Sequence, residues 1–149
     1  MGMFDASSGD LVTFLKAQTG ITALVGSLTS ARIYPVYAKQ KAALPYIVYV
    51  QSGGDSHRHL GGGSGMRRTA LQVYCYGATQ SGADALAEQV RLALANHRGA
   101  MGDSIVYDCR QEVAAFTGYD QADDASDASR YWTMLVFDIS HNETAVSNG

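Results

Sequence analysis

LQVYCYGATQSGADALAEQVRLAL, residues 71–94, joins the pattern of a β-strand directly to the pattern of an α-helix. Apolar and polar or aromatic positions alternate in the first part, which is typical of a strand with one buried face. In the second part Leu86, Val90 and Leu94 recur at the spacing of an amphipathic helix. The stretch therefore predicts a sheet with a helix packed against its apolar face.

The ends of this helix have their own signals. Ser81 and Asp84 stand at the spacing of a capping box, which predicts the helix start. His97 and Arg98 suit the negative end of the helix dipole, and Gly99 fits the position that ends a helix. We expect the helix to occupy residues 81–98.

Working outward, a strand is predicted on each side of the opening stretch. Residues 44–52 (LPYIVYVQS) are rich in β-branched and aromatic side chains, as strands are. A short extended piece precedes it at residues 31–35, where Pro35 limits further pairing. Residues 10–20 and 21–26 carry the apolar spacing of helical turns, with Gly20 and Gly26 as predicted stops.

Two further alternating segments follow the helix, residues 104–119 and 130–140. In the first, Ile105, Tyr107 and Cys109 are predicted to share a face because they are two residues apart. The face predicted to be apolar in the second consists of Tyr131, Thr133, Leu135, Phe137 and Ile139.

The predicted order is therefore α-β-β-β-α-β-β. It indicates an α+β fold, a two-layer domain with a mostly antiparallel sheet of about four strands and two helices packed on one face. The 149 residues suit one domain. Within this single domain, 1–149, we expect a flexible hairpin loop at residues 52–66 and a frayed tail at residues 141–149.

Composition narrows the function classes. The net charge is −3, so the chain lacks the basic field of a nucleic-acid-binding protein. Its apolar runs are far shorter than the ~20 residues of a membrane-spanning helix, and no signal peptide is evident, so no membrane partner is expected. Cys75 and Cys109 lie within hydrophobic segments and are predicted to be reduced core residues.

The glycine-rich segment SGGDSHRHLGGGSGMRR, residues 52–68, resembles a phosphate loop only in composition. It leads from strand to strand, whereas a dinucleotide loop leads into a helix N-terminus. It also lacks the Gly-Lys-Ser/Thr of a Walker loop. His57 and His59 would point the same way on a strand, but a zinc site needs further ligands, and only Asp55 is near. We predict no metal, no cofactor and no catalytic residues.

A mixed aromatic and basic surface is the remaining candidate site. Tyrosine and arginine are enriched at protein interfaces. The second face of the strand at residues 67–77 therefore either meets another subunit or packs under the chain's own loops. The candidate partner-binding residues are His57, Arg58, His59, Arg67, Arg68, Tyr74 and Tyr76.

Four segments in this order, ITALVG, RIYP, ALPYIVYV and LQVYCYGATQSGADALAEQVRLAL, resemble the phage tail completion family, the tail terminator or neck proteins of long-tailed phages. The resemblance implies a structural virion protein that is not an enzyme, located in the tail or neck and assembled in the host cytoplasm. It implies a homo-oligomeric ring, commonly a hexamer, at the head-proximal end of the tail. Such a ring ends tube polymerisation and joins the tail to the head.

The partners that this resemblance implies are further copies of the chain, the tail tube protein and a head connector or stopper protein. DNA would pass through the lumen without specific binding. Two alternatives stay open: another neck component such as a head-side stopper, or a small ligand-binding α+β domain. The hairpin loop at residues 52–66 is a candidate docking arm, because its glycines permit ordering on contact.

Overall fold

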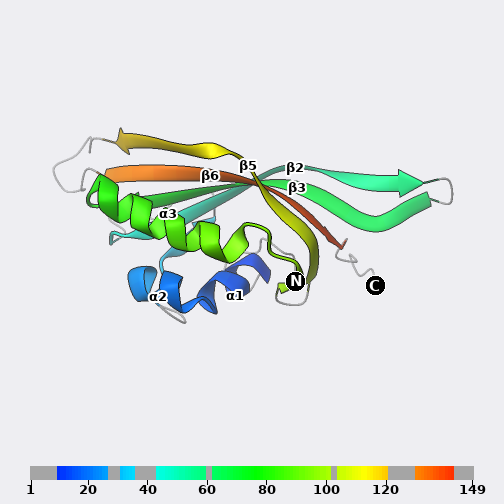
Figure 1. Cartoon of the computed structure of the whole chain (residues 1–149), viewed down its shortest axis with the longest axis horizontal. Helices are drawn as coiled ribbons and strands as arrows, with labels where there is room; N and C mark the ends of the chain where they lie inside the picture. The colour runs from blue at the N-terminus through cyan, green and yellow to red at the C-terminus, as the bar shows by residue number, and fades with distance from the viewer. Residues whose placement is uncertain are drawn as a thin grey trace.

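The computed structural model describes residues 10–26, 31–35, 43–59, 62–101, 104–120 and 130–142 (Figure 1). The elements, in chain order, are α1 (Asp10–Lys16), α2 (Thr19–Val25), β1 (Ile33–Pro35), β2 (Tyr46–His59), β3 (Gly62–Gly77), α3 (Gln80–Leu94), β4 (Gly99–Met101), β5 (Ser104–Asp120) and β6 (Arg130–Asn142).

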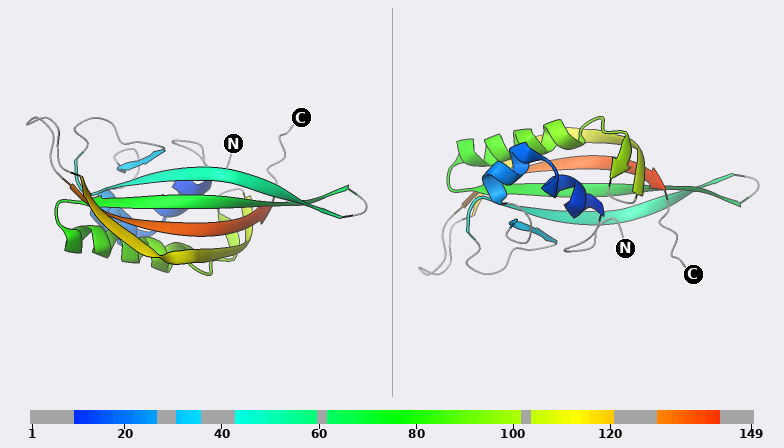
Figure 2. Two further views of the ribbon diagram at one scale, coloured as in Figure 1. Left: turned by 90° about the horizontal axis from the view of Figure 1, so that it is seen from above. Right: turned by 90° about the horizontal axis from the view of Figure 1, so that it is seen from below.

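The strands form one six-stranded sheet in the order β1-β2-β3-β6-β5-β4. β1 pairs with β2 in parallel, and the other neighbours are antiparallel. The sheet is strongly curled, and the three described helices lie against one of its faces (Figures 1 and 2). Long strands accumulate right-handed twist, so β5, with 17 residues, curves strongly while it stays paired with β6 (Figure 1).

The prediction of a two-layer domain, with a mostly antiparallel sheet of about four strands and two helices on one face, is therefore wrong. The described chain is mostly strand, a curled mixed half-barrel of six strands with three helices, two of them only seven residues long. The observed order is α-α-β-β-β-α-β-β-β. The sequence did not predict β4, because three residues are too few to show the alternation of apolar and polar side chains that marks a strand. The parallel pairing of β1 with β2 was not predicted either, because the sequence interpretation assumed that consecutive strands form antiparallel hairpins.

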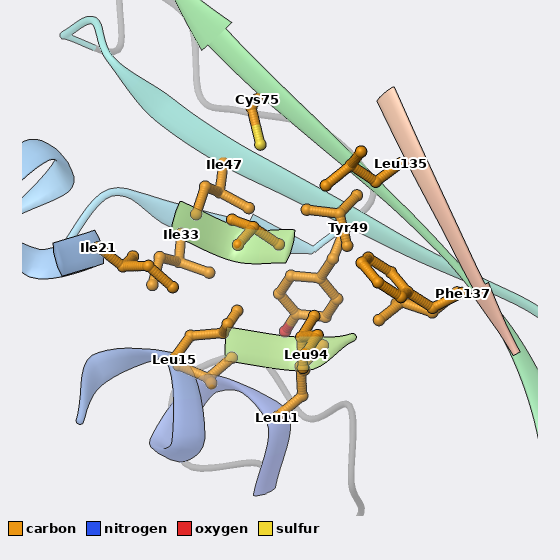
Figure 3. Packing of buried hydrophobic residues seen from close by; sticks show 14 of the residues in the cluster. Leu11, Leu15, Ile21, Ile33, Ile47, Tyr49, Cys75, Leu94, Leu135 and Phe137 are labelled. Atoms are coloured by element: carbon orange, nitrogen blue, oxygen red, sulfur yellow. The ribbon is translucent and has the colours of Figure 1, made fainter. Parts of the chain in front are cut away.

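The hydrophobic core lies between the helices and the concave face of the sheet (Figure 3). Alternate positions of β3 and β6 face it, as the sequence predicts. Among the described residues of these two strands, the buried side chains are Thr69, Leu71, Val73, Cys75, Thr133, Leu135, Phe137, Ile139 and His141. Leu11 and Leu15 of α1 contribute fully buried side chains from the helical layer.

The helix boundaries differ from the predicted caps. Thr79 is the N-cap of α3, and its side-chain oxygen accepts a hydrogen bond from the Gly82 N–H at 3.0 Å, so Ser81 lies inside the helix. The helix ends at Leu94. Gly20, predicted as a stop, lies within α2, while Gly26 closes that helix with φ of 91° as expected.

β5 does not keep a regular alternation. Its register against β6 shifts between Val106 and Asp108 and twice more between Gln111 and Phe116. Each shift places an extra residue in one strand and moves the following side chains to the other face. Val106 and Cys109 are consequently buried, whereas Ile105 and Tyr107 are exposed, so the predicted shared face of Ile105, Tyr107 and Cys109 is wrong.

β2 and β3 continue into the segment that the sequence marks as a glycine-rich loop. The backbones of residues 52–59 and 62–66 pair with each other, from Ser52 with Ala70 to His59 with Gly62. Beyond the pair of Met66 with Asn142, β3 has no further pairing with β6. The end of this hairpin projects beyond the rest of the domain (Figures 1 and 2). His141 and Asn142 belong to β6, and the rest of the predicted tail lies outside the described residues.

Candidate interaction surface

The outer face of the sheet, which points away from the helices, carries a row of aromatic side chains across four strands. We define this aromatic row as Tyr34 (β1), Tyr46 (β2), Tyr76 and Tyr74 (β3) and Trp132 (β6). The ring centroids of neighbours lie 5.9 Å apart for Tyr34 and Tyr46, 4.8 Å for Tyr46 and Tyr76, and 5.7 Å for Tyr74 and Trp132. These separations are those of favourable aromatic pairs, so the row is preorganised by its own contacts.

The row ends against a glycine of β5. A Cβ built on Gly118 would lie 2.2 Å from the Trp132 ring, so the indole lies across the bare backbone. The indole N–H of Trp132 donates to the Asp120 carboxylate at 3.3 Å. Asp120 also forms an ion pair with Arg130, with 3.8 Å between its oxygen and the guanidinium nitrogen. Trp132 is thereby fixed at the end of the sheet where β5 and β6 meet.

Tyr76 lies partly buried in the middle of the row. Burial raises the pKa of Tyr76 to about 12, and the nearby Asp120 carboxylate adds to the increase. The Arg130 guanidinium lies 5.7 Å from the centre of the Tyr76 ring, within the range of a cation–π contact. Tyr76 therefore presents a neutral hydroxyl and a ring already in contact with a cation.

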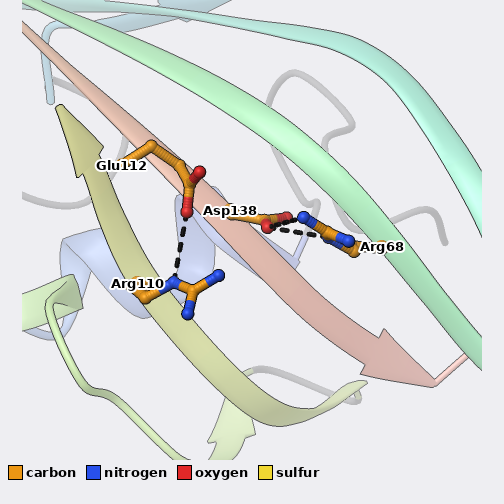
Figure 4. Close-up of polar contacts among 4 residues, drawn as sticks. All are labelled: Arg68, Arg110, Glu112 and Asp138. Carbon is orange, nitrogen blue, oxygen red and sulfur yellow. Dashed lines mark hydrogen bonds and ion pairs between the residues drawn. The ribbon is translucent and has the colours of Figure 1, made fainter.

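A charged cluster occupies the same face further along the strands (Figure 4). Arg68 of β3 contacts Asp138 of β6 through two nitrogens, at 2.7 Å and 2.6 Å from one carboxylate oxygen. On β5, Arg110 pairs with Glu112 at 3.2 Å. Arg110 stands directly opposite Asp138 in the register. The cluster consequently balances charges of both signs and forms no single-sign patch.

The structure brings some of the predicted partner-binding residues together and separates others. Arg68, Tyr74 and Tyr76 lie on one strand and on one face, as the alternation indicates. Tyr74 and Tyr76 are in the aromatic row, and Arg68 is in the charged cluster. The backbones of His57, Arg58, His59 and Arg67 lie on the projecting hairpin, and their side chains are outside the description. Their role in partner binding stays a prediction.

Sequence reasoning missed Tyr34, Tyr46 and Trp132 as members of the same surface. Each stands on a predicted strand, but only strand order shows that they are neighbours. The register places Tyr46, Tyr76, Trp132 and Gly118 in one line across four strands. The lone tryptophan was the one available signal, since tryptophan is enriched at interfaces.

A pocket of about 390 Å³ opens on the other face, between α3 and strands β5 and β6. Asp84 at its edge accepts hydrogen bonds from Thr133 at 2.6 Å and from Gln80 at 3.0 Å, which joins the start of α3 to β6. Glu88 and Arg91, further along α3, form an ion pair. Asp84 and Gln80 thus hold the helix to β6, whereas the Glu88–Arg91 pair lies within α3.

The described residues offer neither a metal site nor a reactive thiol. Within the described ranges no group of three or more His, Cys, Asp or Glu side chains could hold a metal ion. This leaves His57 and His59 untested. Burial raises the pKa of both thiols, that of Cys109 to about 12. A thiol of raised pKa is a poor nucleophile at neutral pH, as the sequence interpretation of core cysteines expects.

The sheet has an incompletely covered edge on each side. β4 pairs only with residues 104–106 of β5. Next to them, the Asn96 N–H donates a hydrogen bond to the Cys109 carbonyl at 2.7 Å. In the described part of the chain, no strand lies beside residues 110–120 of β5 on that side. Across the sheet, β1 pairs only with Ile47, Val48 and Tyr49, and no described strand accompanies β2 beyond them.

None of the helices that the structure describes has the length and apolar character needed to span a bilayer. A comparison with curated protein sequences found no match. The fold is similar to that of a chain in the solved structure of the virion of a native gene transfer agent particle. The TM-score is 0.62 at 15% sequence identity, and the alignment covers 93% of this chain and 96% of that chain.

The family comparison extends over nearly the whole described fold. Residues 9–137 match the tail completion protein gp17 family, from the start of α1 into β6, including the aromatic row. The match covers far more than half of the chain and agrees with the resemblance found in the sequence. The chain therefore belongs to the tail completion protein gp17 family, and it is a structural protein of the virion tail or neck.

Proposed function

We propose that the protein is a tail terminator. In this proposal, copies form a ring, a hexamer, at the head-proximal end of the tail. The ring ends polymerisation of the tail tube and provides the surface that joins the tail to the head connector or stopper protein. DNA passes through the lumen without specific binding.

The family match over residues 9–137 carries this proposal, because it includes every described helix and all the described strands except the end of β6. The geometry is compatible with it. A ring requires contacts between two different surfaces of each subunit. The sheet offers two incompletely paired edges on opposite sides and a preorganised aromatic row between them.

The projecting hairpin remains the proposed docking arm. Its end, residues 57–59 and 62–65, pairs only with itself in the described chain. Because no other described strand pairs with this part of the ribbon, its backbone edges are candidates for contact with another protein. Two-stranded ribbons are marginal in isolation, so binding a partner would stabilise it.

The test of the function is tail assembly in particles produced from a genome that lacks this gene. We expect tails of uncontrolled length or tails without heads in negative-stain images, and normal particles when the gene is restored. Purified protein should bind tail ends as rings. Normal tail length and normal head joining in the absence of the protein would contradict the proposal.

Deleting residues 61–65 tests the arm, and deleting residues 145–149 is the control of equal size. We expect the first deletion to reduce head joining at least tenfold and the second to leave it unchanged. Unchanged joining after the first deletion would exclude the arm without excluding the terminator function.

A further inference from the structure

The pocket beside α3 contains one carboxylate that no described cation neutralises. This cavity of about 390 Å³ is lined by Asp84, Ala87, Glu88, Arg91, Gln111, Thr133 and Leu135. Glu88 and Arg91 pair with each other at 2.9 Å, and this hydrogen bond lowers the pKa of the Glu88 carboxyl. The lining therefore keeps one net negative charge, which belongs to Asp84.

The hydrogen bonds of Asp84 fix its carboxylate and use only one of its two oxygens. Oδ1 accepts from the Thr133 hydroxyl at 2.6 Å and from the Gln80 side-chain amide at 3.0 Å. The Gln80 amide nitrogen also donates to the Thr133 hydroxyl oxygen at 3.0 Å, which closes a ring of three side chains. Among the described residues, no donor contacts Oδ2 of Asp84. The donors are all neutral, so the carboxylate keeps its charge and one acceptor oxygen without a described partner.

The floor of the pocket is apolar next to this carboxylate. Ala87 lies one helical turn after Asp84, and Leu135 follows Thr133 on the same face of β6. An apolar surface beside a carboxylate matches the two parts of a long cationic side chain. The methylene stem of such a side chain packs on the floor while its charged end meets the anion. A cavity of this volume is large enough for a group of that kind.

The single available oxygen favours lysine over arginine. Arginine makes its strongest contact with a carboxylate through two parallel hydrogen bonds, one to each oxygen. Oδ1 of Asp84 already accepts two hydrogen bonds, so its lone pairs are occupied and this arrangement is blocked. A lysine ammonium group is a compact charge that needs one acceptor here and can direct its other protons to water.

We propose that this pocket receives a lysine side chain of a neighbouring virion protein, with the ammonium group on Oδ2 of Asp84 and the stem against Ala87 and Leu135. Charge complementarity selects this occupant. An anionic side chain would be repelled, and a purely apolar one would leave the carboxylate covered without a partner. The inference requires contact with another protein of the particle and does not depend on the terminator function.

The first test uses the isolated protein with Nα-acetyl-lysine methylamide as the probe, and NMR measures the amide chemical shifts. We expect saturable shifts at Ala87 and Thr133. Asp84→Asn keeps an acceptor oxygen for Thr133 and Gln80 but removes the charge, so the Kd should rise at least fivefold. On the wild-type protein, the uncharged norleucine analogue should bind at least fivefold more weakly than the lysine probe, and the arginine analogue should also bind more weakly.

Asp108→Asn is the matched control for this titration. It removes a carboxylate of β5 that does not line the pocket and that pairs with Arg98. We expect the Kd of the lysine probe to stay within twofold of the wild-type value. Urea unfolding of both variants verifies that each is folded under the conditions of the titration.

The second test uses assembled particles and a water-soluble carbodiimide. The reagent activates a carboxylate, and an amine in direct contact then displaces the urea by-product and forms an amide bond. We expect a link between Asp84 and a lysine of another chain, identified by mass spectrometry. Particles that carry Asp84→Asn should lack this link, and so should the purified protein treated in dilute solution.

The outcomes test the pocket separately from the function. A Kd that Asp84→Asn leaves unchanged, tighter binding of the arginine analogue, or particles in which Asp84 forms no such link would overturn the pocket proposal. A link from Asp84 to a lysine of its own chain in the dilute protein would also overturn it, because the chain would then fill its own pocket. None of these results bears on tail termination, which the deletion of the gene tests.

Discussion

Gly77 ends β3 where the chain turns toward α3, and its missing side chain is a packing requirement. A Cβ at this position would lie 2.7 Å from the backbone nitrogen of Ala83, an atom fixed inside the helix. We expect Gly77→Ala to lower the free energy of unfolding by about 1–3 kcal/mol through overpacking. Urea denaturation measures the change.

Gly82→Ala is the control for this prediction. Its Cβ would lie 3.2 Å from the Thr79 hydroxyl, which belongs to a side chain that can shift, and alanine favours a helix. We expect the free energy of unfolding to change by less than about 1 kcal/mol. A disturbed Thr79 cap would lower it, and the higher helix propensity of alanine would raise it. Equal destabilisation by both substitutions would contradict the steric explanation for Gly77.

The two buried thiols predict a loss of stability in alkali. Burial raises the pKa of Cys109 from 9.0 to about 12, and it raises the pKa of Cys75 as well. The native state keeps both protons while the unfolded state releases them, so stability is full below about pH 8 and falls as pH rises from about 9 toward 12. Each thiol contributes a slope of up to about 1.4 kcal/mol per pH unit in that window.

Urea titrations at pH 7.5, 9 and 10 measure this slope. The C75A/C109A double variant should be less stable at pH 7.5 because it leaves cavities, but its stability should fall less steeply between pH 9 and 10. Parallel pH profiles for the variant and wild type would rule out the thiols as the cause.

At the level of elements, the contact between β5 and β6 depends on Gly118 under the Trp132 ring. We expect Gly118→Val to displace the indole and break its hydrogen bond to Asp120. Trp132 is the single tryptophan of the chain, so intrinsic fluorescence reports on it directly. The emission maximum should move to longer wavelength as the ring becomes more exposed.

Asp120→Asn provides the comparison, since the amide oxygen can still accept from the indole while the carboxylate charge is removed. It should leave the emission maximum near that of wild type. An unchanged spectrum for Gly118→Val would show that the ring does not lie across the glycine backbone.

Several elements could be predicted from the sequence because their signals are local. The faces of β3 and β6 follow a strict two-residue period, and the apolar spacing of α3 fixes its buried side. The shifts in β5 could not be predicted, because an extra residue in one strand is defined only against its partner. The N-cap at Thr79 was not predicted, because Ser81 and Asp84 match the spacing of a capping box two residues later.

At the level of the whole molecule, one core ties the short helices to the long strands. Phe137 is fully buried in that core, and Phe116 is half exposed at the sheet edge. We expect Phe137→Ala to lower the free energy of unfolding by about 3–5 kcal/mol. Phe116→Ala, the same chemical change, should cost less than about 1 kcal/mol in the isolated protein.

Thermal and urea unfolding check these values, and tail assembly supplies a second readout. Phe116→Ala should impair assembly more than its small effect on stability explains. If Phe116→Ala destabilises the isolated chain as much as Phe137→Ala, then Phe116 belongs to the fold of the monomer and its exposure has no bearing on assembly.

The candidate surface was only partly accessible from the sequence. Tyr74 and Tyr76 could be placed on one face because they are two residues apart. Tyr34 joins them because β1 pairs in parallel with β2. Trp132 joins them from β6, more than fifty residues further along the chain. Sheet order is a property of the complete fold, and the local patterns do not contain it.

The inaccessibility of the native thiols has a practical consequence for locating the protein in a particle. Cys75 and Cys109 are the two cysteines of the chain, and both are buried. A cysteine introduced at exposed Leu92 would react with a maleimide reagent while the native pair stays silent. A gold cluster or dye could then mark each subunit on the virion, with no need to remove the residues that fill the core.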